Sequence, residues 1–408
     1  MSSISQCRVC KSRVDQFLDL GRQPLSDAFR LPDASGDEFF YALEVGLCDG
    51  CGMVQLMREV PREKMFHRDY PYFSSGSSVM RAHFEHTAGT LLDTELTGPD
   101  PFIVEIGCND GVMLSTIAAQ GVRHLGVEPS SGVAEVAATK GVRIRTDFFE
   151  HSTAVDIAAA DGPADLVYSA NTICHIPYLD SVFRGLDALL REGGIFVFED
   201  PYWGAIVEQR SFDQIYDEHF YFFTAQSVRA MARQFGFDLV DVQRLGVHGG
   251  EIRYTVARFG ERAVSPSVDG LIADEQRREL DSLPTARRFA AEVRGIRDDL
   301  VELLRGLTAQ GHRVVGYGAT AKSATVANYC GLGPELISFV SDTTAAKQGR
   351  LTPGSHIPVV GPEAFRDTRP EYALLFAWNH ADEIMAKEKE FRAGGGRWIQ
   401  YVPAVHTS

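Results

Sequence analysis

Short apolar runs that end in glycine-rich or polar turns recur in two stretches of the chain. The first stretch opens with FIVEIGCNDGVML, in which residues 102–106 predict a buried strand that runs into a glycine-rich turn and a helix. Further strands are predicted, in order, within HLGVEP, RIRTDFFE, ADLVYSANTICHIP and LLREGGIFVFEDP. Buried strands that alternate with helices are typical of an open α/β sheet, whose ligands bind beyond the carboxyl ends of parallel strands.

The second stretch repeats this pattern. HRVVGYGATAKSATVANYCG predicts a strand, a glycine-rich turn and a helix, and ISFVSD, ALLFAWN and RWIQYVP predict further strands. Before it, SLPTARRFAAEVRGIRDDLVELLRGL predicts a long amphipathic helix, and Pro284 interrupts the helical pattern of residues 265–310. We therefore predict an α/β protein of three parts: a small metal-stapled domain (residues 1–65), a central Rossmann-like domain (66–260) and a second Rossmann-like domain (261–408).

The composition of the chain excludes several classes of protein. The 408 residues suffice for about two to three domains. Forty basic and 55 acidic residues give a net charge of −15, and no Lys/Arg run offers the clustered cations that nucleic-acid phosphates need. No apolar run approaches the roughly 18 residues of a membrane span, and MSSISQCRVC lacks the apolar stretch of a signal peptide. Seven cysteines are too few for a disulfide scaffold of this size, so we expect a cytoplasmic protein without nucleic-acid or membrane partners.

Four cysteines form two CxxC pairs, Cys7 with Cys10 and Cys48 with Cys51. Four thiolates from two such knuckles complete a tetrahedral zinc shell, and a closed four-sulfur site is structural because no position is left for a substrate. The alternatives are a redox pair or two unrelated turns, although a redox CxxC is not usually doubled. We expect loops and short strands between the two knuckles.

The first glycine-rich turn resembles the acidic-x-Gly-x-x-x-Gly pattern of the S-adenosylmethionine-dependent methyltransferase fold, with Glu105, Gly107 and Gly111 in these places. Glycines let the backbone approach a ligand closely. Glu128 ends the second strand, 21 residues after Gly107, where an acid can accept hydrogen bonds from both ribose hydroxyls. A dinucleotide site is the alternative, but the wider glycine spacing favours the methyl donor.

Other residues complete the predicted donor site. Asp147 and Phe148 are placed to meet the adenine amino group and ring face. The remaining candidates lie in or beside the same turns and strand ends: Tyr72, Asn109, Pro129 and Asn171.

Two aromatic-rich segments flank the central strands. RDYPYFSSGSSVM, with Tyr70 among its rings, precedes a helix from about Val79; it predicts either a lid over the active site or a linker that packs on the next domain. SFDQIYDEHFYFFTAQSV holds Tyr216, Glu218 and His219. A polar pair in an apolar segment must be satisfied or functional, and an imidazole beside a carboxylate suits a general base, although neighbouring residues on a strand point apart. A structural network is the alternative.

Two further histidines are candidates. His175 lies just beyond the fourth predicted strand, and His248 precedes the two glycines of VHGGEIRY. Those glycines indicate a close approach of the backbone to a ligand or to the neighbouring domain.

The second glycine-rich turn offers an anion site. Its free N–H groups, the start of the following helix and Lys322 would suit a diphosphate, and Trp378 and Asn379 end a strand at the same predicted sheet edge. Ser323 stands near the place where a dinucleotide fingerprint has its third glycine, which weighs against NAD. A scaffold domain without a ligand is the other alternative.

The order of these motifs resembles the sugar C-methyltransferases over essentially the whole chain. The double CxxC, the methyl-donor turn, YDEH, HGGE, GYGATAKS and FAWNHADEI carry the resemblance. These enzymes act on nucleotide-linked keto-deoxysugars in antibiotic pathways, and the chain looks closest to those that methylate carbon 3 of dTDP-3-amino-4-keto-2,3,6-trideoxyglucose, as in tetronitrose or kijanose formation. Enzymes that methylate a 3-hydroxy sugar, as in mycarose formation, are similar.

The resemblance implies a monomer of three domains with its active site between the last two. It also implies that S-adenosylmethionine is the methyl donor and that the C-terminal domain holds the dTDP part, near Lys322, Ser323, Trp378 and Asn379. His219 would remove the proton on carbon 3 with Glu218 beside it, and His175 or a tyrosine would hold the resulting enolate oxygen. A tyrosine of DYPYF would also have a catalytic role; we favour Tyr70, although the sequence does not separate it from Tyr72. An O- or N-methyltransferase, or a zinc-stapled binding protein, remains an alternative.

Overall fold

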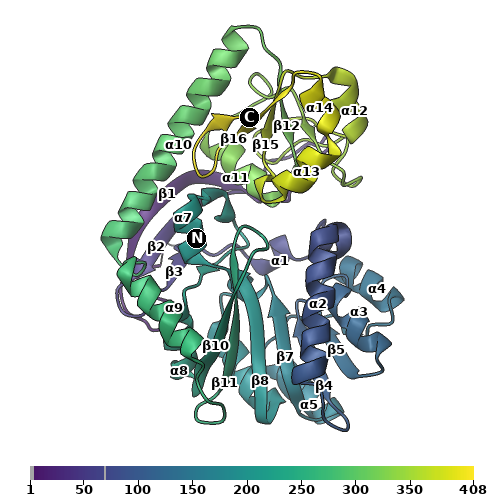
Figure 1. Cartoon of the computed structure of the whole chain (residues 1–408), viewed down its shortest axis with the longest axis vertical. Helices are drawn as coiled ribbons and strands as arrows, with labels where there is room; N and C mark the ends of the chain where they lie inside the picture. The colour runs from purple at the N-terminus through teal and green to yellow at the C-terminus, as the bar shows by residue number, and fades with distance from the viewer. Residues whose placement is uncertain (1–3, 69) are drawn as a thin grey trace.

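The computed structural model describes residues 4–68 and 70–408 and folds them into three sheets (Figure 1). Two sheets belong to α/β units that form the lower and upper lobes of Figure 1, and the N-terminal sheet lies beside both of them. Helix α10 (Leu283–Ala309) runs along one flank from one lobe to the other. None of the described helices is long and apolar enough to span a membrane.

The N-terminal sheet is built on two long strands rather than on the loops and short strands that we expected. Its order is β1-β2-β3-β9, and β1 and β2 pair antiparallel on either side of a loop over residues 25–39. The expectation failed because β1 buries Leu18 and Leu20 and packs against α10 and α11 (Ala321–Tyr329), contacts that come from distant parts of the chain. The elements are β1 (Val14–Pro24), β2 (Phe40–Cys48), β3 (Val54–Leu56), β9 (Tyr221–Phe222) and α1 (Arg62–Met65).

The central sheet has seven strands in the order β10-β11-β8-β7-β4-β5-β6. The strands from β8 to β6 are parallel, and β10 and β11 add an antiparallel edge. The strands are β4 (Phe102–Ile106), β5 (Arg123–Val127), β6 (Ile144–Arg145), β7 (Ala164–Ala170), β8 (Leu190–Pro201), β10 (Phe237–Leu245) and β11 (Glu251–Arg258). The helices are α2 (Ser78–Thr94), α3 (Val112–Ala119), α4 (Ser131–Thr139), α5 (His151–Asp161), α6 (Leu179–Leu189), α7 (Trp203–Gln209) and α8 (Ala225–Gln234).

The C-terminal sheet repeats the parallel arrangement in the order β14-β13-β12-β15-β16-β17, with β17 antiparallel. The strands are β12 (Val314–Tyr317), β13 (Val340–Ser341), β14 (Val359–Val360), β15 (Tyr372–Leu375), β16 (Arg397–Gln400) and β17 (His406–Thr407). The other helices of this unit are α12 (Pro362–Thr368), α13 (Ala381–Lys387) and α14 (Lys389–Ala393). The predicted fold class, a small metal domain followed by two Rossmann-like α/β units, is confirmed.

Two helices connect the α/β units. α9 (Pro266–Arg277) and α10 are separated where the helical pattern is interrupted, and Pro284 stands in the first turn of α10, where a proline costs no hydrogen bond. Phe289 of α10 packs edge-on against Trp203 of α7, with ring centroids 5.1 Å apart. The predicted long helix is therefore confirmed, and it is packed into the central unit. Four short 3-10 helices cover Ser74–Gly76, Ile173–His175, Phe212–Gln214 and Trp378–His380.

Candidate functional site: a cavity between three domains

The two CxxC pairs meet at one end of the N-terminal sheet. The Sγ atoms of Cys7, Cys10, Cys48 and Cys51 all lie within 4.8 Å of one another. Four sulfurs held at about 2.3 Å from a zinc ion would lie about 3.8 Å apart, and the pairs Cys7–Cys51 and Cys10–Cys48 measure 3.7 and 3.3 Å. The Gln55 side chain donates to Cys7 Sγ at 3.3 Å, as suits a thiolate. The donor set and its spacing fit the predicted structural zinc ion.

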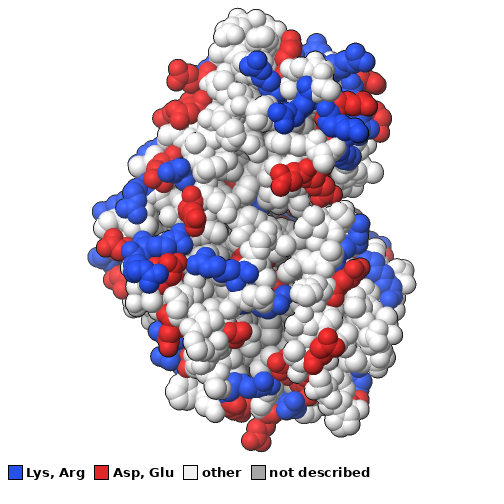
Figure 2. Space-filling model, in the orientation of Figure 1, with Lys and Arg blue, Asp and Glu red and all other residues white. Residues whose placement is uncertain are grey.

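A cavity of about 620 Å³ opens where the lobes meet. On the face shown in Figure 2, acidic and basic side chains are interspersed, and the junction between the lobes is mostly uncharged. All three domains line the cavity. The resemblance had implied a site between the last two domains only, and the N-terminal domain is therefore an addition to it. The expected residues that line it are Tyr70, Tyr72, Gly107, Asn109, Glu128, Pro129, Phe148, Asn171, His175, Tyr216, Glu218, His219, His248, Lys322 and Asn379.

The first glycine-rich turn forms one end of the cavity. Gly107 has a φ of +69°, and a Cβ there would collide with the Thr172 side chain. Both the backbone conformation and the lack of space therefore require a glycine. Glu128 Oε2 accepts from the Asn109 N–H at 3.0 Å, and Oε1 accepts from the Ser130 N–H at 2.8 Å. Each carboxylate oxygen keeps a lone pair for a ribose hydroxyl, so this end fits the predicted nucleoside of the donor.

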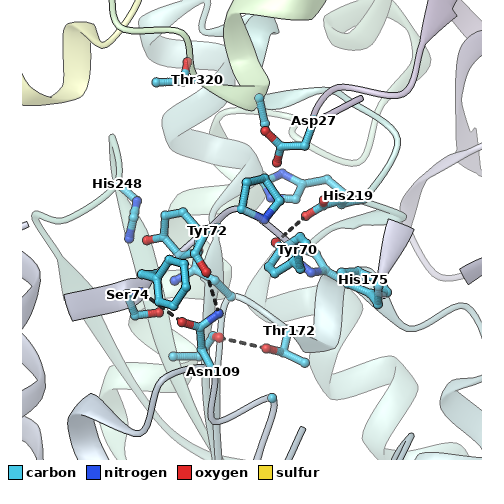
Figure 3. A pocket seen from close by; sticks show the side chains of 18 of the residues that line it. Asp27, Tyr70, Tyr72, Ser74, Asn109, Thr172, His175, His219, His248 and Thr320 are labelled. Atoms are coloured by element: carbon cyan, nitrogen blue, oxygen red, sulfur yellow. Dashed lines mark hydrogen bonds between the residues drawn. The ribbon is translucent and has the colours of Figure 1, made fainter. Parts of the chain in front are cut away.

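The aromatic segment before α2 is fastened to that turn (Figure 3). Asn109 Oδ1 accepts from the Ser74 N–H at 2.9 Å, and its Nδ2 donates to the Tyr72 carbonyl at 3.1 Å. The Tyr72 residue is 43% exposed, whereas the Tyr70 hydroxyl points at Glu218. Tyr70, which we favoured, therefore lies with Glu218, and Tyr72 lies beside the first glycine-rich turn.

Three of the expected donor residues do not line the cavity. Glu105 is 4% exposed beneath the turn, and its burial together with the nearby Asp110 and Glu128 raises the pKa of its carboxyl well above the usual value. Gly111 begins α3 with a φ of +72° and meets neighbouring helix side chains rather than the cavity. Asp147 is drawn aside by Arg145, at 3.1 Å, so its expected contact with adenine is not supported.

His219 has both ring nitrogens engaged. Its Nδ1 lies 2.7 Å from the Gln214 carbonyl, which can only accept, so Nδ1 carries the hydrogen. Its Nε2 then has the lone pair, and the Tyr216 hydroxyl donates to it at 2.7 Å. Burial, followed by the nearby His175 and Lys322, lowers the pKa of His219 well below its usual value. The imidazole is therefore neutral at pH 7 with Nε2 ready to accept a proton.

Glu218 is paired with Tyr70 rather than with His219, which differs from our expectation. The Tyr70 hydroxyl donates to Glu218 Oε2 at 3.0 Å. Glu218 lies in a turn ahead of β9, where its carboxylate and the His219 imidazole have different hydrogen-bond partners. Burial, followed by the charges of Asp27 and Asp217, raises the pKa of Glu218 well above its usual value.

His175 lies in the wall of the cavity, and its Nε2 is buried. Its ring stacks between Phe66 (centroids 5.7 Å apart) and His219 (5.1 Å), and Nε2 has no hydrogen-bond partner among the described residues. Burial lowers the pKa of His175 to about 3, so the ring is neutral at pH 7. A neutral imidazole can donate from one nitrogen, which fits the expected contact with a developing oxyanion.

The second glycine-rich turn forms the opposite end of the cavity. Lys322 is in the first turn of α11, and its Nζ is buried without a hydrogen-bond partner in the described parts of the chain. Burial lowers the pKa of Lys322, and Asp213 opposes that shift. The Thr320 side chain caps α11 by accepting from the Ser323 N–H. The Lys322 Nζ lies 5.4 Å from the centroid of the Trp378 ring. A cation without a hydrogen-bond partner at a helix start fits an anionic ligand.

Two residues expected at this end have other tasks. Ser323 donates its hydroxyl to the Thr320 carbonyl at 2.6 Å and so belongs to the cap of α11. The Trp378 indole donates to Asp213 at 2.6 Å, and a Cβ on Gly249 of the HGGE segment would touch its ring. Gly249 therefore permits a close approach to the neighbouring domain, as one of our two interpretations predicted, whereas Gly250 packs against Ala205 of α7. His248 does line the cavity.

Several residues that line the cavity were not among the candidates predicted from the sequence. Asp27 and Arg62 reach the cavity from the N-terminal domain, Phe66 from the start of the central domain, and Lys347 from the C-terminal unit. The Arg62 guanidinium lies over the Phe148 ring, 4.1 Å from its centroid. The only available signal was PLSDAF, an apolar turn that carries one acid.

Comparison with known proteins gives three matches to family models. Residues 7–66 match a zinc binding domain, residues 81–242 a methyltransferase domain, and residues 246–403 a C-methyltransferase C-terminal domain. The chain is also 34% identical, over 405 residues, to C-methyltransferase NovU of Streptomyces niveus, with 98% of this chain and 96% of NovU covered.

Among solved structures, the chain is similar to an S-adenosylmethionine-dependent methyltransferase of Anabaena variabilis (16% identity, TM-score 0.34, 45% of this chain and 86% of that chain). It is also similar to magnesium protoporphyrin IX methyltransferase of Synechocystis with bound S-adenosylmethionine (14% identity, TM-score 0.33, 44% and 79%). The match to NovU along nearly the whole of both chains decides the matter: the chain belongs to the S-adenosylmethionine-dependent C-methyltransferase family that contains NovU.

Proposed function

We propose that this enzyme methylates carbon 3 of a dTDP-linked 4-keto-deoxysugar, with dTDP-3-amino-2,3,6-trideoxy-4-keto-glucose as the preferred acceptor. The observation that carries the proposal is the place of His219. His219 lines a cavity with the donor turn at one end and the buried Lys322 at the other, and its Nε2 carries the lone pair. The motif resemblance to sugar C-methyltransferases supports the choice of acceptor. The monomeric state and cytoplasmic location stay predictions.

The chemistry requires a carbon nucleophile. A ketone at carbon 4 acidifies the hydrogen on carbon 3, and His219 Nε2 takes that proton once the Tyr216 hydroxyl gives way. The electrons of the broken C–H bond form the carbon 3–carbon 4 double bond, and the negative charge moves to the carbon 4 oxygen. His175 Nε2, which has no other partner among the described residues, donates to that oxygen. The bound donor supplies an electrophilic sulfonium methyl group.

Residues at the acceptor end would hold the nucleotide. The start of α11 and Lys322 would bind the diphosphate, and Asn379 lies on the same side of the cavity. The residues of the chain thus hold, align and deprotonate the acceptor, and alignment alone can be worth several kcal/mol.

Proton NMR of the amino acceptor in deuterated water, with enzyme and S-adenosylmethionine, tests the proposal. We expect a new methyl singlet on a quaternary carbon 3. Exchange of the carbon 3 hydrogen without methylation would support the enolate but point to a different sugar. No change with this acceptor and methylation of the 3-hydroxy analogue would move the assignment to that sugar. A methyl signal on oxygen or nitrogen would overturn carbon methylation of this acceptor.

A further inference from the structure

The N-terminal domain places a carboxylate in the acceptor half of the cavity. Asp27 belongs to the loop after β1, lines the cavity and points into it beside the histidines and tyrosines of the site (Figure 3). We propose that Asp27 is an acceptor-specificity residue that binds an ammonium group next to the reacting carbon. This inference rests on the proposed function, and it makes the zinc-stapled domain part of the active site.

The loop that carries Asp27 is held in place from two sides. The buried Ser26 N–H donates to Asp217 Oδ1 at 3.0 Å, which fastens the loop to the segment of the catalytic residues. On the other side, Arg30 and Leu351 exchange two backbone hydrogen bonds, of 3.2 and 2.7 Å, with the C-terminal unit. A side chain on a loop fixed at both ends is preorganised for a ligand.

The existing partner of Asp27 leaves it incompletely satisfied. Among the described residues, its carboxylate has one hydrogen bond, from Lys347 Nζ at 3.4 Å, and the side chain is 15% exposed. The same Nζ makes a shorter bond, of 2.9 Å, to the Ala319 carbonyl. A carboxylate can accept about four hydrogen bonds, so Asp27 keeps most of its capacity for a ligand.

The unsatisfied carboxylate favours a positively charged group on the acceptor. Asp27 faces this part of the cavity, and its cation, Lys347, is shared with the Ala319 carbonyl. Asp342, also at this end, already accepts from the Ala319 and Thr344 N–H groups, at 2.7 Å each. A hydrogen bond from an ammonium to a carboxylate is charge-assisted and is stronger than one from a neutral hydroxyl.

Calorimetric titration of the amino acceptor and of its 3-hydroxy analogue tests this, because binding to enzyme filled with S-adenosylhomocysteine needs no turnover. For Asp27→Asn we expect binding of the amino acceptor to weaken about 10- to 100-fold and binding of the hydroxy analogue to change little. Asp33→Asn, an exposed residue of the same loop, is the matched control. Lys347→Met should preserve or increase the preference for the amine, because it removes a competing cation.

Equal weakening of both acceptors by Asp27→Asn would overturn the inference and make the residue a structural partner of Lys347. An unchanged preference for the amine would overturn it as well. If the unmodified enzyme binds and methylates neither sugar, the proposed function fails instead, and the two failures are therefore distinguishable.

Discussion

The two ends of the cavity are built on the same backbone frame. At the donor end the Gly107 N–H donates to the Val127 carbonyl at 2.8 Å, and at the acceptor end the Gly318 N–H donates to the Ser341 carbonyl at 2.8 Å. Each frame has an acid just past its second strand, Glu128 or Asp342.

Each acid also binds in the same way. It accepts one N–H from its glycine-rich turn and one from the residue two positions further along the chain. The backbone therefore does not distinguish the two ends.

The side chains around the two frames differ. Glu105 lies buried beneath the donor turn, outside the cavity, and its pKa is raised well above the usual value, whereas Lys322 and Lys347 line the cavity at the acceptor end. Lysines suit a diphosphate. The comparison teaches that one backbone frame can serve two ligands, and that the cations at the acceptor end distinguish it from the donor end.

The largest expected effect lies between the two ends. His219→Asn should lower kcat by about 10²- to 10⁴-fold, because the shorter amide cannot take a proton from carbon. Binding of donor and acceptor should change little, since neither frame is touched. Turnover assays with calorimetry of each ligand check this, and His151→Asn, at an exposed position, is the control. Near-normal turnover would transfer the role of base to Glu218 or Tyr216.

Two substitutions, one at each end of the cavity, would test whether the two ends bind their ligands independently. Glu128→Gln replaces an accepting oxygen with an amide nitrogen, so donor binding should weaken about 10- to 100-fold while binding of dTDP stays unchanged. Asp342→Asn should have the opposite pattern. Titration of both variants with both ligands measures this. If each variant weakened both ligands alike, the two ends would not be independent sites.

Substitution of Lys322, the buried cation at the acceptor end, should have a smaller effect. Lys322→Met should weaken binding of dTDP about tenfold, because a buried cation is lost from the start of α11. Donor binding should not change. Lys387→Met, an exposed residue of α13, is the matched control in the same titration. Unaltered binding of dTDP would place the diphosphate elsewhere.

The donor end could be predicted from the sequence because its parts are close along the chain. Gly107 and Glu128 belong to consecutive strands of one βαβ unit, and the spacing of glycines and acid carries the geometry. Asp147 was not supported, because a neighbouring arginine draws its side chain away, and no spacing rule shows that.

The acceptor end could be predicted only in part. Lys322 follows a glycine-rich turn and was found, but Asp27 and Lys347 are 320 positions apart and meet through tertiary packing alone. The Glu218–Tyr70 pair joins two segments in the same way, across 148 positions. Residues of this kind carry no local pattern. The sequence therefore predicted a site at the YDEH segment but not the distant residues that contact it.

The smallest expected effect links the acceptor cation to the base. Burial, followed by the nearby His175 and Lys322, lowers the pKa of His219, so the free enzyme keeps an unprotonated base as the pH falls. The acid limb of kcat/KM should therefore lie below pH 6.5, the ordinary value for histidine. Lys322→Met removes one of the charges that lower this pKa, so the limb should move upward, by less than about one pH unit. Glu128→Gln, at the opposite end, should leave the limb in place. If the acid limb of the kcat/KM profile were absent in Glu218→Gln, the Glu218 carboxyl would be the titrating base, because His219 is intact in that variant.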